Sequence, residues 1–165
     1  MSRHFLIDGY NLVKSTPVFA AKSLQEGRNA LIRWLTVCRP QGSVNNTTLV
    51  VFDGRDDVFG GSLGNDDIKI VYTPNTSADD YIRDIVEHHP RPKDLVVVSN
   101  DKDITVYARH CGAAVISVEA FTSPLTSTVN KNSKPQGNKG QTKYISHTQA
   151  DAINKELKKL WLNDD

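Results

Sequence analysis

The sequence predicts an α/β fold in which a mostly parallel central sheet is sandwiched between helices, and three observations predict it. Short, continuous apolar runs such as "TTLVVFD" (47–53) are typical of strands that are covered on both faces. These runs alternate along the chain with segments of helical periodicity, which indicates parallel strands joined by helices. Several runs also end in an aspartate, at the edge where such a sheet binds its ligands.

Five segments are expected to form strands, because each is short, apolar and bounded by residues that favour turns. The first is expected to run into a turn at Gly9, Tyr10 and Asn11, with Tyr10 packed under that turn. The third alternates between apolar and polar residues, which suits a more exposed strand. The five segments are 4–8, 47–53, 68–72, 95–99 and 113–117.

Three segments with apolar residues at helical spacing are expected to form helices: 23–38, 77–89 and 104–112. Ser23, with Glu26 three residues later, has the pattern of a capping box at the start of the first helix. Trp34 is expected at the edge of the buried face of that helix. Gly112 is expected to close the third helix, since glycine readily takes the backbone conformation of a C-terminal cap.

The composition changes after Phe121 and divides the chain into three parts. Residues 1–125 are expected to form the folded domain. Residues 126–146 are poor in apolar side chains and contain lysines but no acid, so a flexible basic loop is expected there. Helical periodicity resumes in 147–165, and this last helix is expected to dock on the same domain.

The overall composition is that of an ordinary soluble protein. The 165 residues are 38% apolar and 24% charged, and the formal net charge of +1 predicts neither a strong polyanion binder nor an acidic tail. Cys38 and Cys111 form no CxxC pair, which indicates free thiols in a reducing compartment. No stretch resembles a signal peptide or a membrane span, so a cytoplasmic location without membrane partners is expected.

Acidic residues cluster where the predicted strands end. Asp8, Asp53 and Asp101 each follow an apolar run, and Asp79 and Asp80 lie in the first turn of a predicted helix. Carboxylates that converge repel one another unless a cation lies between them. Clustered aspartate oxygens without a His or Cys partner suit a hard ion such as Mg²⁺ or Mn²⁺, and this pattern predicts phosphodiester hydrolysis.

Each of these acids also has a purely structural interpretation. A single Asp after a strand is usually a turn former or a helix cap. Asp53 is as easily the first residue of an Asp-Gly turn. Asp79 and Asp80 are open to the interpretation of first-turn partners of the helix dipole, which is favoured for Asp80. Dinucleotide and P-loop functions are excluded, because neither glycine fingerprint is present.

In these segments the sequence resembles the NYN family, the YacP-like nucleases of the PIN-like superfamily. The matching stretches are "FLIDGYNLV", "VVFDGR", "TSADDYIRDIV", "VVSNDKDI" and "GAAVIS", in the order of the family and over residues 4–121. The resemblance implies a three-layer α/β/α, Rossmann-like (PIN-like) domain that cleaves RNA with one or two divalent ions.

The resemblance also implies roles for particular residues. Asp8, Asp79 and Asp101 match the metal-binding acids of the family, Asp103 matches an accessory acid, and Asn11 completes the first signature. Asn11 is also open to a second interpretation, in which it only stabilises its turn. Relatives often carry a glutamate shortly before the "AD" pair, where this chain has "PNTSAD".

Two functions follow as expectations. The first is an endoribonuclease that needs Mg²⁺ or Mn²⁺ and cuts single-stranded RNA, with mRNA and the ribosome as candidate partners, because some members of the family act on mRNA within the ribosome. The alternative is a module that binds RNA or the ribosome with weak or no cleavage. The cations expected to contact RNA phosphates are Arg55, Lys102, Lys131, Lys134, Lys139 and Lys143. Tyr10, expected to pack under its turn, is also open to the interpretation that it stacks on a base.

Overall fold

The fold was examined in a computed structural model, which describes residues 2–21, 23–54 and 66–126. The chain divides into two compact units, Met1–Thr122 and Ser123–Asp165, and of the second unit only the short helix α7 (Ser123–Thr126) is described. The first unit contains, in chain order, β1 (His4–Asp8), α1 (Gly9–Ser15), α2 (Pro17–Ala20), α3 (Leu24–Cys38), β2 (Thr47–Asp53), β3 (Ile68–Thr73), α4 (Ala78–His88), the 3₁₀ helix η1 (Pro92–Asp94), β4 (Leu95–Val98), α5 (Lys102–His110), β5 (Ala114–Ile116) and α6 (Val118–Phe121).

The central sheet has five strands in the order β3-β2-β1-β4-β5, and all four pairings are parallel. β1 is in the middle, where Leu6 pairs with Leu49 on one side and with Val97 on the other. The chain builds β2 and β3 outward on one side of β1 and then returns to build β4 and β5 on the other. This change of direction makes β1 and β4 the topological switch point, beyond which open parallel sheets bind ligands.

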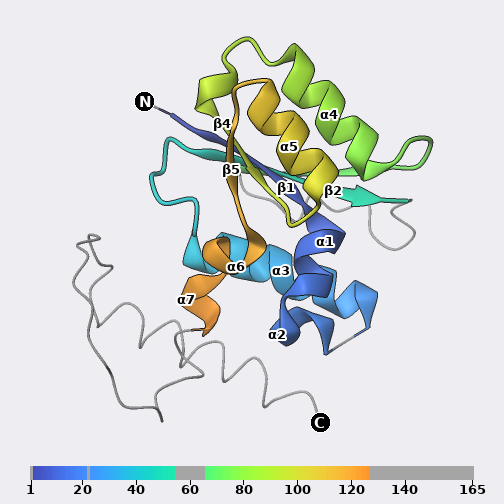
Figure 1. Cartoon of the computed structure of the whole chain (residues 1–165). Helices are drawn as coiled ribbons and strands as arrows, with labels where there is room; N and C mark the ends of the chain where they lie inside the picture. The colour runs from blue at the N-terminus through green and yellow to red at the C-terminus, as the bar shows by residue number, and fades with distance from the viewer. Residues whose placement is uncertain (1, 22, 55–65, 127–165) are drawn as a thin grey trace, which may run out of the picture. The chain divides into compact units, whose positions relative to one another are not determined.

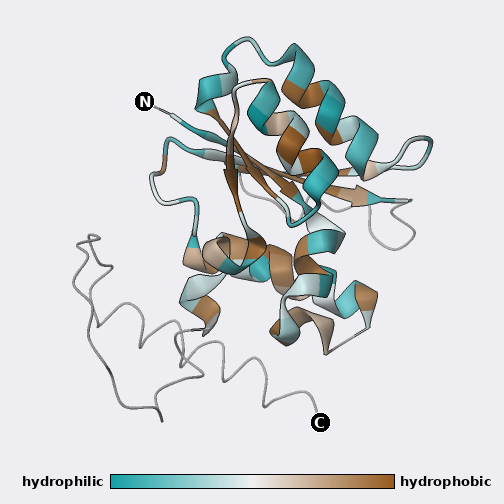
Figure 2. Cartoon of the chain, in the orientation of Figure 1, coloured by the Kyte–Doolittle hydropathy of each residue, from teal (hydrophilic) through white to brown (hydrophobic). Residues whose placement is uncertain are grey.

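Helices cover both faces of the sheet, which gives three layers (Figure 1). α4 and α5 lie on one face, and α1, α2, α3 and α6 lie on the other. The strands are the most hydrophobic part of the structure, whereas hydrophilic and hydrophobic residues alternate along α4 and α5 (Figure 2). The core beneath α4 and α5 joins these helices to β1, β2 and β4 through apolar residues such as Leu6, Val51, Ile82, Val97 and Ile104.

The opposite face is packed with aromatic rings. Trp34 of α3 is only 1% exposed, with ring centroids 6.1 Å from Phe19 of α2 and 5.7 Å from Phe121 of α6. The prediction that Trp34 lies at the edge of the buried face is therefore wrong. The short helices α2 and α6, which the sequence pattern did not predict, supply the two rings that cover it.

The predicted elements are otherwise found. All five strands lie within one residue of their predicted bounds, and the sheet is entirely parallel. The capping box of Ser23 and Glu26 is formed, and Gly112, with φ +92°, follows the last residues of α5. Both cysteines are free thiols and half-buried.

Two helix starts differ from the prediction, for the same reason. The expected turn after β1 is the first turn of α1, and α5 begins at Lys102, two residues before its predicted start. In both cases the preceding aspartate accepts a hydrogen bond from a backbone N–H and so acts as the helix N-cap. The segment 147–165, predicted to be a helix, and the predicted basic loop beyond residue 126 lie outside the described residues.

Candidate active site at the carboxyl edge of the sheet

The sheet topology brings the predicted acids to one edge. Asp8 and Asp53 are the last residues of β1 and β2, and Asp101 follows β4 after Ser99 and Asn100. Asp79 lies in the first turn of α4. Because the strands are parallel, their carboxyl ends point the same way, so Asp8 and Asp101 lie on the two sides of the switch point between β1 and β4.

Three of these carboxylates also hold the start of a helix through the Oδ1 atom. Asp8 accepts from the backbone N–H of Asn11 at 3.3 Å, and Asp101 accepts from those of Asp103 at 2.8 Å and Ile104 at 3.2 Å. Asp53 accepts from the N–H of Ala78 at the start of α4. Within the described part of the chain, the Oδ2 atoms of these aspartates have no hydrogen-bond partner. Each of these acids therefore fixes a helix start through one oxygen, and no described residue bonds to the other oxygen.

Asp8 is the most perturbed of the acids. It is only 7% exposed, and burial, as the largest cause, raises its pKa from 3.8 to about 6. The hydrogen bond from Asn11 lowers this pKa, and the charges of Asp79, Asp53 and Asp101 raise it further. Four carboxylates thus act on one another electrostatically at this edge, as expected for side chains that converge.

Asp79 is half-buried and lies in the same electrostatic environment. Burial and the charges of Asp101 and Asp53 raise its pKa, while the guanidinium of Arg83 lowers it. Arg83 lies one turn after Asp79 on α4 and is the cation that most affects this acid. Sequence inspection did not single it out, because one arginine in an amphipathic helix carries no distinctive signal.

The donors suit a hard cation, although they do not form a closed cage. Among the described residues, no three His, Cys, Asp or Glu side chains form a group that could hold a metal ion by themselves. Mg²⁺ is commonly held by only one or two carboxylates, with water and substrate phosphate supplying the other oxygens. A buried carboxylate with a raised pKa, close enough to other carboxylates to be affected by their charges, is a donor set of that kind.

The other predicted site residues lie around this group. Asn11 is in α1, and its Oδ1 accepts a hydrogen bond from the N–H of Asn100 at 2.9 Å. Asp103 and Lys102 are exposed in the first turn of α5. Asp80 is exposed and lies 3.8 Å from Arg83, so its surroundings match the interpretation as a first-turn residue of α4.

Two further polar residues support the loop that carries Asp101. Ser99 is buried, and its Oγ accepts from the N–H of Asp101 at 3.1 Å. Asn100 bonds through its side chain to Val118 and Glu119 of α6. The polar "SND" run after an apolar strand was the only sequence signal for these residues, and nothing in the sequence linked Glu119 to them.

Aromatic rings pack between the end of β2 and the start of α1. Tyr10 packs edge-on against Phe52, with ring centroids 5.0 Å apart, which confirms that it packs under the start of α1. Phe52 also stacks on Tyr72 at 5.7 Å. Gly9 lies against Phe52 so closely that a Cβ there would be 2.3 Å from the ring. Residue 9 therefore has to be glycine for α1 to start directly after Asp8.

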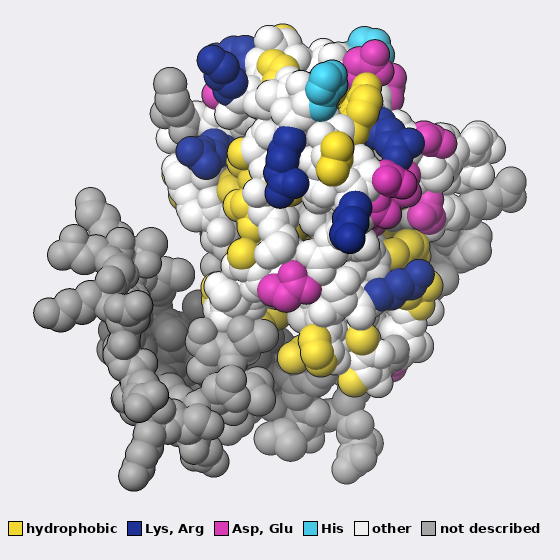
Figure 3. Space-filling model, in the orientation of Figure 1, with side chains coloured by type: hydrophobic (Ala, Val, Ile, Leu, Met, Phe, Trp, Pro, Cys, Tyr) yellow, Lys and Arg dark blue, Asp and Glu magenta, His cyan; other side chains and the backbone are white. Residues whose placement is uncertain are grey.

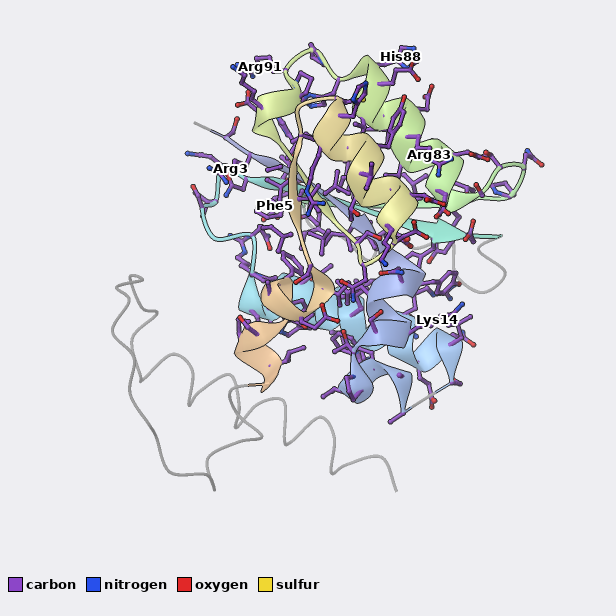
Figure 4. The ribbon with its side chains drawn as sticks, in the orientation of Figure 1. Arg3, Phe5, Lys14, Arg83, His88 and Arg91 are labelled. Carbon is purple, nitrogen blue, oxygen red and sulfur yellow. The ribbon has the colours of Figure 1, made fainter. Side chains whose placement is uncertain are left out.

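Of the six cations predicted to contact RNA, only one lies within the described residues. Arg55, Lys131, Lys134, Lys139 and Lys143 lie outside the described residues, which leaves Lys102. Basic and acidic side chains alternate over the face formed by α4 and α5, and no single basic patch forms there (Figure 3). Lys14 of α1 and Arg83 of α4 lie on opposite sides of the carboxyl edge of the sheet (Figure 4).

A five-stranded parallel sheet in a three-layer sandwich, with aspartates gathered beyond its carboxyl ends, is the arrangement of a PIN-like fold. The model of the YacP-like NYN domain matches residues 5–162, and the chain belongs to that family. No curated protein matches the sequence. Within the described residues, no helix is long and apolar enough to cross a membrane.

Two crystal structures of Rae1 (YacP) from Bacillus subtilis are similar to this chain. For a mutant form the TM-score is 0.60 with 19% sequence identity, over 98% of this chain and 86% of that one. For the second structure the TM-score is 0.55 with 19% identity, over 94% of this chain and 80% of that one. At this level of identity the likeness establishes the fold, which is the one expected from the sequence.

Proposed function

We propose that this protein is a divalent-metal-dependent endoribonuclease that hydrolyses single-stranded RNA. The observation that carries the proposal is the buried carboxylate of Asp8, whose pKa is raised to about 6 by burial and by three neighbouring carboxylates. Such an arrangement is costly for a protein unless a cation offsets it, and perturbed acids of this kind are typical of functional sites. Membership of the YacP-like NYN family supports RNA as the substrate.

The residues that would hold the ion are Asp8, Asp79 and Asp101, with Asp53 as an accessory acid. A bound Mg²⁺ or Mn²⁺ would activate a water molecule and neutralise charge on the phosphate. The protein itself contributes fixed positions for these carboxylates, because Asp8 and Asp101 are anchored as helix caps. Binding of this kind needs no reorganisation of the backbone at the site.

The substrate would lie across the open edge of the sheet. Arg83, Lys14 and Lys102 lie around this edge or next to its acids, and they are the described cations best placed to contact phosphates. An open edge accepts the middle of an RNA chain as easily as its end, which favours endonucleolytic cleavage. We include mRNA held by a ribosome among the single-stranded RNA substrates of this protein.

A second function is favoured by two observations. The chain has no glutamate in "PNTSAD", where relatives often have one, and no three potential ligands in the described part form a complete metal site. Both observations fit a module that binds RNA or the ribosome with weak or no cleavage. The two functions share RNA binding and differ in metal-dependent hydrolysis.

The deciding experiment is cleavage of a labelled single-stranded RNA with Mn²⁺ or Mg²⁺, with and without EDTA, and with and without ribosomes. A circular RNA of the same sequence tests for an internal cut, since an enzyme that needs an end cannot open it. We expect cleavage by the wild type, none with EDTA, and none by Asp8→Asn or Asp101→Asn.

The matched control is Asp66→Asn, because Asp66 is exposed at the opposite end of β3. RNA binding should persist in all three variants, as measured by fluorescence anisotropy. Binding without cleavage by the wild type would favour the second function. Cleavage that survives in both Asp8→Asn and Asp101→Asn would refute the assignment of the site.

A further inference from the structure

The loop between β4 and α5, residues 99–101, is held in place by contacts with α1 and α6 and by the side chain of its own Ser99. The N–H of Asn100 donates to Asn11 Oδ1 of α1 at 2.9 Å, and the N–H of Asp101 donates to Ser99 Oγ at 3.1 Å. The side chain of Asn100 reaches in the other direction, toward α6. Asn100, which directly precedes Asp101, is therefore bonded to α1 through its backbone and to α6 through its side chain.

The amide of Asn100 uses both its acceptor and its donor on α6. Its Oδ1 accepts from the N–H of Val118 at 2.9 Å, and its Nδ2 donates to Glu119 Oε1 at 2.7 Å. The second distance is short, as expected when the acceptor is a carboxylate. Only an amide can make both bonds, since an aspartate lacks the donor and would face Glu119 with a like charge.

We propose that Asn100 and Glu119 are positioning residues, which fix the loop so that Asp101 faces Asp8 across the switch point. This inference rests on the proposed nuclease function and extends it to a pair of residues outside the acid group. Asp101 belongs to the loop that starts α5, and Asp8 belongs to the end of β1. Their separation therefore depends on how that loop sits against its neighbours, and α6 is the neighbour that the side chain of Asn100 contacts.

Glu119 acts here as a hydrogen-bond acceptor, which sets it apart from an acid that binds metal or transfers a proton. Its side chain is exposed and bonds to Asn100. A glutamine at this position presents the same Oε1 acceptor without the charge. Glu119→Gln should therefore retain the function of the residue, whereas Glu119→Ala should lose it.

The test compares Glu119→Gln, Glu119→Ala and Asn100→Asp with the wild type in three measurements. The first is amide hydrogen exchange by NMR in EDTA, at the N–H groups of Asn100, Asp103 and Ile104, which are hydrogen-bonded in this loop and its cap. The second is Mn²⁺ affinity by calorimetry. The third is kcat and KM for RNA cleavage.

We expect Glu119→Ala and Asn100→Asp to speed exchange at these amides, to weaken Mn²⁺ binding and to lower kcat about fivefold to tenfold, the effect of losing one hydrogen bond. KM should change little, and Glu119→Gln should retain most of all three properties. The matched control is Glu87→Ala, which removes an exposed glutamate that accepts from Tyr107 at 3.1 Å on the α4–α5 side. It should leave the three properties as in the wild type.

Two results would overturn the inference. One is unchanged exchange, Mn²⁺ affinity and kcat in Glu119→Ala and Asn100→Asp. The other is loss of activity in Glu119→Gln equal to that in Glu119→Ala, which would assign the role to the charge. A wild type that cuts no RNA would refute the nuclease proposal instead, and the exchange data would still decide whether Glu119 holds the loop.

Discussion

Asn11 and Asn100 are 89 residues apart in sequence and are joined by a hydrogen bond of 2.9 Å, from the backbone N–H of Asn100 to Oδ1 of Asn11. The backbone N–H of Asn11 donates in turn to Oδ1 of Asp8 at 3.3 Å. Asn11 thus connects the strand end that carries Asp8 with the loop that carries Asp101. Its role is to hold two acid-bearing segments together, which is more than stabilising its own turn.

Asn11→Ala should lower kcat about tenfold and destabilise the fold by about 1 kcal/mol, the typical net contribution of one hydrogen bond. Asn11→Asp keeps an acceptor for the N–H of Asn100 and should retain more stability than Asn11→Ala. Urea denaturation and RNA cleavage measure the two effects. Asn45→Ala, at an exposed loop position, is the control. Equal stability of Asn11→Ala and the wild type would show that this bond contributes nothing.

Asp8→Asn should stabilise the metal-free protein at neutral pH while abolishing cleavage. The pKa of Asp8 is about 6 in the folded protein, compared with 3.8 for an aspartate without such surroundings, as in the unfolded chain. The folded protein therefore binds the proton of Asp8 more tightly than the unfolded chain does. Stability contributed by the protonated form is present below pH 3.8 and is lost as the pH rises toward 6. An Asn at this position keeps the helix cap and carries no charge at any pH.

The measurement is urea denaturation of both proteins in EDTA between pH 4 and 8. The variant should be more stable by on the order of 3 kcal/mol above pH 7, and the difference should shrink to about 0.5 kcal/mol at pH 4. Other groups that titrate in this range affect both proteins alike and cancel in the difference. A difference that is independent of pH would contradict the raised pKa of Asp8.

Mn²⁺ or Mg²⁺ should raise the Tm of the wild type at pH 7.5, because a ligand that binds only the folded state stabilises it. At a hundredfold excess over Kd the gain is about 2.7 kcal/mol. Asp8→Asn and Asp101→Asn should gain much less, and Asp66→Asn should gain as much as the wild type. Differential scanning fluorimetry with matched EDTA samples measures these shifts. Equal gains in all four proteins would place the ion elsewhere.

Gly9→Ala should destabilise the fold by about 1–3 kcal/mol, as expected for an overpacked site. The added Cβ would lie 2.3 Å from Phe52, so either the ring or the start of α1 has to move. Movement of α1 would shift Asp8, so cleavage should fall as well. Phe52→Leu in the same protein should recover part of the lost stability, which a double-mutant cycle by urea denaturation measures. Purely additive effects would exclude this contact as the cause.

Cys38 should react slowly with thiol reagents in the native protein. Burial raises the pKa of its thiol to about 11, so very little thiolate is present at pH 7.5, and the thiolate is the reactive form. Cys111→Ser isolates Cys38 for a DTNB assay. The rate should rise sharply in urea, which exposes the thiol. Fast labelling of Cys38 without urea would contradict its burial.

The sequence predicted the fold well because the strand signals are strong and local. Runs such as "TTLVVFD" leave few alternatives to a buried strand, and Ser23 with Glu26 defines a helix start by chemistry within four residues. The Asp at the end of β1, of β2 and of the segment after β4 correctly indicated the edge of the sheet at which the acids gather. The structural interpretation of these acids as helix caps is correct for Asp8 and Asp101. The same two acids also share an electrostatic environment with Asp79.

What the sequence missed depends on contacts between distant segments. Trp34 is buried by Phe19 and Phe121, which lie 15 residues before it and 87 residues after it in the printed sequence. The short helices that carry these rings have too few residues to show a periodic pattern. Glu119 likewise has no local signal, because its importance arises only when α6 packs beside the loop of Asn100.

Asp8 and Asp101 cap helices and are also the acids that we propose to bind the metal ion, and this affects how related chains should be compared. A descendant that had lost catalysis would still be selected for a good cap at both positions, and Asn caps a helix as well as Asp does. Drift from Asp to Asn would therefore be tolerated by folding alone, whereas persistent Asp at both positions would require selection for negative charge. The ratio of Asp to Asn at these two positions would thus indicate which related chains have kept the proposed metal-dependent cleavage.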